Sequence, residues 1–235
     1  MRWPWLARSL HKWLALIVGV QLAIWTLTGL YMVVVHIDII HGDHLVRTPP
    51  KPRFDLTGLR SPASLMDHGS DHSARLIALR GAPAYVLDGA DGRRVVDARS
   101  GAPLIPLNQA EIEPIAKSIY AGEGSIETVE LLAEAPMEIK NRAVPIWRVE
   151  FTGLGDPTLY ISPQTGELVA RRHDLWRAFD VAWMLHIMDY KERTDVNNPL
   201  LRVVTAAAAV TAISGAWLLV YSFPKRKRRR ARSAT

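Results

Sequence analysis

The chain has 235 residues, of which 49% are hydrophobic, and a formal net charge of +6. It contains no cysteine, which excludes disulfides, thiol nucleophiles, iron–sulfur clusters and cysteine-ligated zinc. The sequence also lacks a Ser-His-Asp order, a phosphate loop, a dinucleotide fingerprint and HExxH, so no motif supports a hydrolase, kinase or flavoprotein. The basic excess does not indicate a nucleic-acid partner, because residues 42–199 hold 18 Lys and Arg against 22 Asp and Glu. The positive charge belongs to the two ends of the chain.

A first uncharged segment of 23 residues, residues 13–35, follows a basic N-terminal segment, residues 1–12. About 20 apolar residues suffice to cross the hydrocarbon core of a bilayer. The segment is longer than the roughly 7 to 15 apolar residues of a signal peptide, and no small-residue cleavage site follows it. It therefore predicts a transmembrane helix that stays in the protein.

A second stretch, residues 200–223, is apolar apart from Arg202 and predicts another transmembrane helix, followed by a basic tail over residues 224–235. All acidic residues lie between Asp38 and Asp195. Lys and Arg close to a span stay on the cytoplasmic side. We therefore expect both termini in the cytoplasm and the middle of the chain outside a bacterial inner membrane. The tail either binds anionic membrane lipid or acts only as a topology anchor.

The middle of the chain begins with residues 36–73, which are polar, rich in His and broken by Pro. This composition predicts a connector with at most a short helix around residues 61–66.

An α+β domain with antiparallel β meanders and one or two helices is expected over residues 74–172. Short β-rich runs separated by Gly-containing turns predict two or three strands between residues 74 and 104. Asn108, followed by Glu111, is typical of a capping box and predicts a helix over residues 108–121.

A second β series follows, in which Trp147 and Phe151 lie on one side of an alternating run. The two β series share a strand, a turn that ends in Gly, and a returning strand. This similarity suggests a degenerate internal repeat over residues 74–124 and 125–172.

Residues 173–199 complete the extracytoplasmic part. Trp176, Phe179, Trp183 and His186 recur at helical intervals, which predicts an amphipathic helix and a loop at the outer membrane face. The predicted fold class is therefore a membrane α plus α+β protein, with two transmembrane helices flanking the β-containing domain.

Three segments resemble the PepSY-associated transmembrane family. RSLHKWLALIVGVQLAIWTLTGLYM is similar to its first helix, TLYISPQTGELVARR to the closing hairpin of a PepSY domain, and WMLHIMDY to its last segment. PepSY domains are proposed as peptidase inhibitors or propeptide-like modules, whereas larger transmembrane relatives resemble haem-containing reductases of ferric siderophores. The resemblance thus implies haem-assisted electron transfer to an extracytoplasmic acceptor, or a non-enzymatic module that restrains an envelope peptidase or senses an envelope ligand.

The first alternative implies a b-type haem. His11 and His186 match the LH dipeptides of the family and are the expected ligands. His36 stands at the outer end of the first span; an ideal helix would place it on nearly the same face as His11, roughly 37 Å away, where it could share an iron with His186. The other interpretation is that these residues only anchor helices at the interface. Because two spans cannot enclose haem alone, we expect a homodimer or a partner membrane subunit.

A second histidine group lies in the connector. His41 and His44 form one pair, and His68 and His72 form another with the i, i+4 spacing of one helical face. Zinc, copper or ferrous iron would suit such ligands. The alternative is a solvated linker, since Gly69 weakens any helix there.

Overall fold

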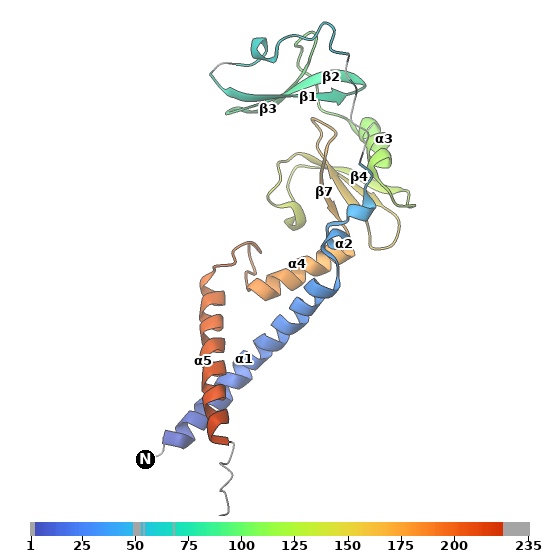
Figure 1. Ribbon diagram of the computed structural model, residues 1–235. Coiled ribbons are helices and arrows are strands. Elements are labelled where there is room, and N and C mark those ends of the chain that lie inside the picture. Colours follow the sequence, from blue (N-terminus) through green and yellow to red (C-terminus); the bar gives the residue numbers. More distant parts are fainter. Residues whose placement is uncertain (1–2, 49–52, 54, 68, 223–235) are drawn as a thin grey trace, which may run out of the picture. The chain divides into compact units, whose positions relative to one another are not determined.

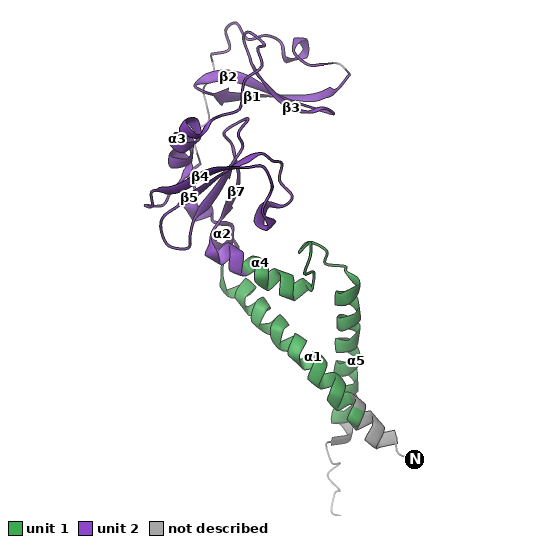
Figure 2. Ribbon diagram, turned by 180° about the vertical axis from the view of Figure 1, so that it is seen from behind, with its two compact units in different colours: residues 1–35, 179–235 green, residues 36–178 purple. Residues whose placement is uncertain are grey.

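The computed structural model describes residues 3–48, 53, 55–67 and 69–222. The chain divides into two compact units (Figure 2). Unit 1 comprises residues 1–35 and 179–235 and is helical, whereas unit 2 comprises residues 36–178 and holds the described strands (Figure 1).

Unit 1 contains two long apolar helices, α1 (Trp3–Val34) and α5 (Pro199–Ser222), together with the end of α4 (Asp174–Ile187). Helices α1 and α5 contact each other. They are long and apolar enough to cross a membrane over His11–Val34 and Pro199–Leu219. The predicted fold class, two such helices flanking antiparallel sheets with a few helices, is confirmed.

The helix ends follow from local chemistry. Helix α1 starts at Trp3, ten residues before the predicted span, because the basic segment continues the same helix. Asn198 caps α5 by accepting the N–H of Leu201 at 2.9 Å, and Pro199 occupies the first helical position, where its missing N–H has no cost.

Helix α4 ends at Ile187, and the predicted loop follows it. Met188 has a positive φ of 55°, which breaks the helix. The Asp189 carboxylate then accepts four backbone N–H groups of residues 191–195, and these hydrogen bonds lower its pKa to about 2. A carboxylate therefore organises the connection to α5.

Unit 2 contains two antiparallel sheets, ordered β1-β2-β3 and β4-β5-β6-β7. The predicted meanders are confirmed. Its elements are α2 (Ile37–His41), two short 3₁₀ helices (Asp43–Leu45 and Pro62–Ser64), β1 (Asp71–Leu79), β2 (Ala82–Gly89), β3 (Gly92–Asp97), α3 (Gln109–Ile119), β4 (Ile126–Leu132), a third 3₁₀ helix (Met137–Ile139), β5 (Ile146–Phe151), β6 (Thr158–Ile161), β7 (Leu168–Arg172) and the start of α4.

A single core joins the two sheets and α3. Val86 of β2, Ile112 of α3 and Val149 of β5 are each fully buried in it. The alternation predicted for β5 is confirmed, since Trp147 and Phe151 face the same core. Burial of this shared apolar surface holds the sheets together in one unit.

The segment predicted as a connector is part of the folded unit. Ile40 and Leu45 are buried, and Leu45 packs into the shared core. Leu65 and Met66 cover the outer face of the first sheet around Tyr85. This cover explains why β2 is buried on both faces.

Each sheet carries the same turn after its third strand. In residues 97–101 the N–H of Gly101 donates to the carbonyl of Asp97 at 2.8 Å, and in residues 162–166 the N–H of Gly166 donates to that of Ser162 at 2.9 Å. Both glycines have positive φ, 79° and 70°, a region that suits glycine. The shared turn supports the internal repeat suggested by the sequence.

Helix α3 begins with the predicted capping box, because Asn108 and Glu111 each accept the other's backbone N–H, at 3.1 and 3.0 Å. The helix contacts β4, β5 and β6. It therefore packs with the second sheet, and the internal repeat over residues 74–124 and 125–172 stays a prediction.

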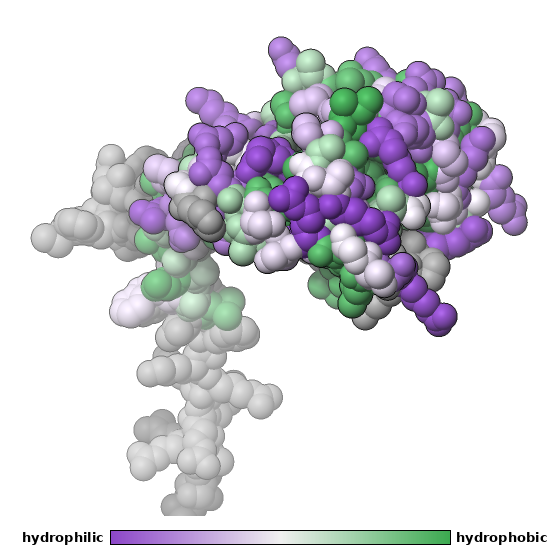
Figure 3. Space-filling view, turned by 90° about the horizontal axis from the view of Figure 1, so that it is seen from above, coloured by the Kyte–Doolittle hydropathy of each residue, from purple (hydrophilic) through white to green (hydrophobic). Residues whose placement is uncertain are grey.

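The face of unit 2 seen in Figure 3 carries mostly hydrophilic residues with small hydrophobic patches between them. Such a mixture is ordinary for a surface in contact with water. The long helices differ, since Ile17 of α1 and Val203 of α5 are 71% and 67% exposed. Exposed apolar side chains along a helix of spanning length suit contact with lipid.

The shared core can be tested with two isoleucines. We expect Ile112→Ala to lower the free energy of unfolding of unit 2 by roughly 2–5 kcal/mol, because it leaves a cavity in a fully buried site. Ile105→Ala, at a side chain 75% exposed, should change it by less than about 0.5 kcal/mol. Pulse proteolysis of the full-length protein in urea measures both values. Equal effects would contradict a core centred on α3.

Candidate functional site

Two histidines of unit 1 lie at helix contacts. His11 of α1 places its Nδ1 2.8 Å from the hydroxyl of Ser214 on α5. The Ser214 hydroxyl donates its own proton to the carbonyl of Thr211 at 2.9 Å. With its proton so used, the oxygen of Ser214 is free to accept from the His11 tautomer that carries its proton on Nδ1 and its lone pair on Nε2.

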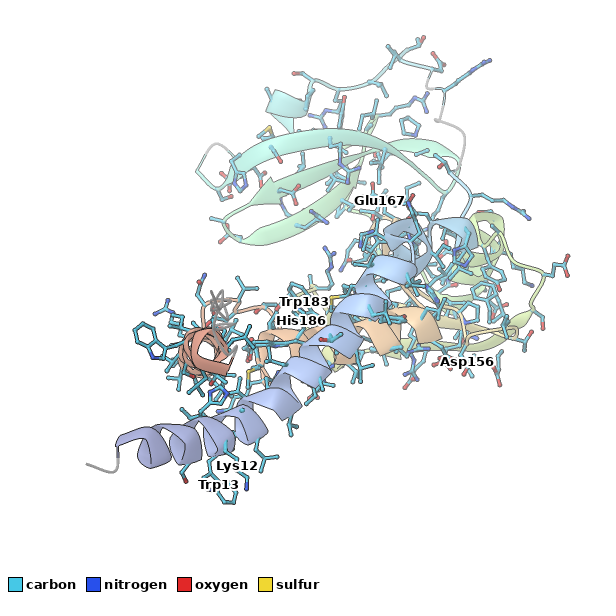
Figure 4. The ribbon with its side chains drawn as sticks, turned by 60° about the horizontal axis from the view of Figure 1, so that its bottom comes forward. Lys12, Trp13, Asp156, Glu167, Trp183 and His186 are labelled. Atoms are coloured by element: carbon cyan, nitrogen blue, oxygen red, sulfur yellow. The ribbon has the colours of Figure 1, made fainter. Side chains whose placement is uncertain are left out.

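His186 of α4 has the same arrangement against α1. Its Nδ1 lies 2.9 Å from the hydroxyl of Thr28, which donates to the carbonyl of Ile24 at 2.8 Å. The hydrogen-bond network again assigns the proton to Nδ1. Trp25 also donates from its indole to the His186 carbonyl at 2.8 Å, so the end of α4 is fixed on α1. Figure 4 labels His186 with Trp183 one helical turn before it.

Glycines lie beside both imidazoles. A Cβ at Gly215 would stand 3.3 Å from Cε1 and 3.7 Å from Nε2 of His11. A Cβ at Gly29 would stand 3.7 Å from Cε1 of His186. A side chain at Gly215 would crowd the His11 ring, whereas one at Gly29 would make an ordinary contact with the His186 ring.

The two imidazoles are separated along α1. Thr28, which holds His186, lies 17 residues after His11, a rise of about 26 Å on an α-helix. The hydrocarbon core of a bilayer is about 30 Å thick. The two rings therefore belong to opposite ends of the span and cannot share one metal ion.

The ideal-helix extrapolation from His11 does not reach His36. Helix α1 ends at Val34, and His36 has an extended backbone with φ −60° and ψ 138°. Its exposed side chain accepts the N–H of Asp38 at 3.4 Å and caps α2. The expected shared face with His11 is thus wrong, because the helix stops first. A ligand role for His36 stays a prediction.

The connector histidines are distributed over different elements. His41 ends α2, His44 lies in the following 3₁₀ helix, and His72 lies in strand β1, so the predicted helical face for His68 and His72 is wrong. His68 lies outside the described residues. Within the described ranges, no group of three or more His, Cys, Asp or Glu side chains could hold a metal ion. Metal binding by these histidines stays a prediction.

A buried histidine was missed by the sequence reasoning. His173 is only 4% exposed, and its Nε2 lies 3.1 Å from the carbonyl of Ile40. Its ring meets that of His44 edge to face at 5.6 Å. Burial lowers the pKa of His173, and the nearby His44 and Arg177 act in the same direction. Nothing local in the sequence marks it, because its partners lie about 130 residues away.

Residues 8–235 match the family described as the PepSY-associated TM region. The chain belongs to this family. The family and the two long apolar helices together show a membrane protein with a PepSY domain. No curated protein and no solved structure matches the chain.

The buried His173 generates a prediction about pH. The unfolded chain protonates this residue near pH 6.5, whereas the folded chain does so only at lower pH. Its contribution to stability is therefore complete above about pH 6.5 and is lost as the pH falls through the folded pKa. We expect His173→Gln, which keeps a donor near the Ile40 carbonyl, to lose less stability between pH 7 and 5 than the parent protein.

The measurement is the urea midpoint of unit 2 at several pH values, by pulse proteolysis of the full-length protein. The two proteins differ only at residue 173, so the difference between their pH profiles reports on His173. Parallel pH profiles would contradict a neutral, buried His173.

Proposed function

We propose that this membrane protein carries electrons across the bilayer to an extracytoplasmic acceptor such as a ferric siderophore, with b-type haem held by His11 and His186. One observation carries the proposal. At each end of α1 an imidazole is fixed through Nδ1 by a hydroxyl, with its Nε2 lone pair left for a ligand.

This arrangement fits what haem iron requires of a histidine. A metal-bound imidazole coordinates through one nitrogen, while the other N–H donates to an outer partner that fixes the tautomer and the ring orientation. Ser214 and Thr28 provide such partners. In the apolar phase a lone pair on Nε2 without a partner is unfavourable, and in the described part of the chain neither Nε2 has a hydrogen bond. Iron would satisfy it.

Haem bound at these positions would supply a one-electron carrier inside the membrane. The chain's own residues do the positioning: Ser214 and Thr28 orient the rings, and Gly215 and Gly29 leave room beside them. Since the sequence has no nicotinamide or flavin motif, the electron donor would be another protein.

His11 and His186 of one chain, about 26 Å apart along α1, would hold separate haems, and a further histidine for each would come from another subunit. A second copy of the chain supplies matching histidines when a two-fold axis brings like helices together. The outward side of α5 suits this contact, because Val210, Ile213 and Trp217 are 56%, 69% and 65% exposed. We therefore propose a homodimer that forms a four-helix bundle; a partner membrane subunit with its own histidines would serve equally.

A reduced-minus-oxidised visible spectrum of the purified protein in detergent tests the proposal. We expect a b-type α band. His11→Ala and His186→Ala should each remove about half of it, because the two rings are too far apart to serve one iron. A colourless protein after haem-supplemented expression would contradict the proposal and leave a non-enzymatic PepSY module that restrains a peptidase or senses an envelope ligand.

A paired substitution separates a ligand role from a loss of folding. Thr28→Val removes the acceptor for His186 Nδ1 at nearly constant volume, and should weaken haem binding roughly 10- to 100-fold. Thr26→Val is the control, since the Thr26 hydroxyl is exposed and bonds only within its own helix. Equal haem affinity in the two variants would show that Thr28 does not orient a ligand.

Orientation in the membrane is a further part of the proposal. The basic residues at both ends support cytoplasmic termini and an external unit 2, in a bacterial inner membrane. We expect green fluorescent protein fused after Thr235 to fluoresce, and alkaline phosphatase inserted after Gly153, in an exposed loop of unit 2, to be active. The opposite pair of results would reverse the topology and the direction of electron flow.

A further inference from the structure

A cleft of about 780 Å³ lies in unit 2. Its lining comes from the start of β1, the hairpin of β2 and β3, residues 141–146, the turn of residues 162–164 and Val169 of β7. The volume is that of a site for a small organic ligand. The cleft therefore offers a place for a molecule rather than for a bare ion.

The polar groups in the cleft leave an excess of positive charge. Asp88 is its carboxylate, and this group is paired with Arg93 at 2.7 Å and lies 3.5 Å from the hydroxyl of Ser73. Arg142 also lines the cleft and is exposed, and in the described part of the chain its guanidinium has no hydrogen bond or ion pair. One cation thus remains after the internal pairing.

Arg142 also lines a neighbouring pocket of about 250 Å³. That pocket includes His41, Arg171 and Arg172, with the Arg172 guanidinium 3.8 Å from the ring centre of Trp176. No carboxylate lines it, although Asp43 pairs with Arg171. The two hollows form a basic region with Arg142 between them.

The remaining lining groups suit an oxygen-rich ligand. Asn141 and Gln164 present amides, and Ser73 presents a hydroxyl. No edge strand contributes more than two residues, these being His72 and Ser73 of β1, Gly92 and Arg93 of β3, and Val169 of β7, so the cleft does not follow a strand edge along which a peptide would add. The geometry favours a compact ligand with several carboxylates over an extended chain.

We propose that this cleft binds the electron acceptor as an anionic ferric chelate of the hydroxycarboxylate type, with Arg142 as the central contact. The identification of the ligand as an iron complex rests on the proposed electron-transfer function. Guanidinium groups bind carboxylates through paired hydrogen bonds, and this preference supports a negatively charged ligand with carboxylate groups.

The test uses redox-inert probes, so binding is measured apart from electron transfer. Gallium(III) citrate is titrated into the full-length protein in detergent by calorimetry. We expect saturable binding that weakens roughly 10-fold or more in Arg142→Gln. Arg47→Gln is the matched control, because Arg47 is an exposed arginine of unit 2 whose side chain has no ion pair among the described residues.

Three further probes test the specificity of binding: a cationic gallium complex, metal-free citrate and an acidic peptide. A gallium complex of a linear trihydroxamate with a free ammonium group carries positive charge and should bind much more weakly. Metal-free citrate should also bind more weakly than the chelate. Equal binding of either probe, equal loss in both arginine variants, or Arg142-dependent binding of an acidic peptide in place of the chelate would overturn the proposal.

Failure of this proposal is distinguishable from failure of the proposed function. A protein with a b-type spectrum and no Arg142-dependent chelate binding refutes the cleft alone. A colourless protein that binds gallium citrate through Arg142 refutes electron transfer and keeps the cleft.

Discussion

A side chain inside a bilayer has to satisfy its hydrogen-bonding groups without water. In unit 1 this constraint is met by two relays, in each of which an imidazole Nδ1 donates to a hydroxyl that donates to a helix carbonyl. The relays join α5 and the end of α4 to α1. They also leave the Nε2 of each ring without a hydrogen bond in the described structure. The contacts that hold the helices together therefore also keep this nitrogen available to a ligand.

Helix α4 is held at both of its ends. In unit 2 the Arg177 guanidinium lies 3.0 Å from Glu138 and 3.0 Å from the Thr158 hydroxyl. Burial, together with the hydrogen bond to Glu138, raises the pKa of Tyr160 and keeps its phenol protonated. In unit 1 the last turn of α4 is fixed by Trp25. Each end of α4 is thus fixed by polar contacts within its own unit.

The two sheets of unit 2 are joined both in their core and at their surface. The sheets share one apolar core, which removes the central faces from water. Ion pairs then join the sheets at the surface: Arg75 of β1 binds Glu167, and this contact lowers the pKa of Glu167. The loops outside the core remain polar, and the basic cleft forms among them.

The sequence alone determined the features that depend on neighbouring residues. The two spans follow from runs of apolar residues, the α3 start from Asn108 and Glu111, and the buried side of β5 from simple alternation. Each of these signals acts within a few residues, where backbone geometry and hydropathy are enough. The helical extrapolation to His36 failed because it crossed the end of α1.

Only the tertiary structure decided which distant groups meet. The partners of His11 and His186 lie 203 and 158 residues away, and their hydroxyls give no local signal of this role. The same holds for the burial of His173 and for the cleft, whose lining comes from five separate segments. Such contacts depend on how whole helices and sheets pack, and packing is set by the summed burial of many side chains rather than by any short pattern.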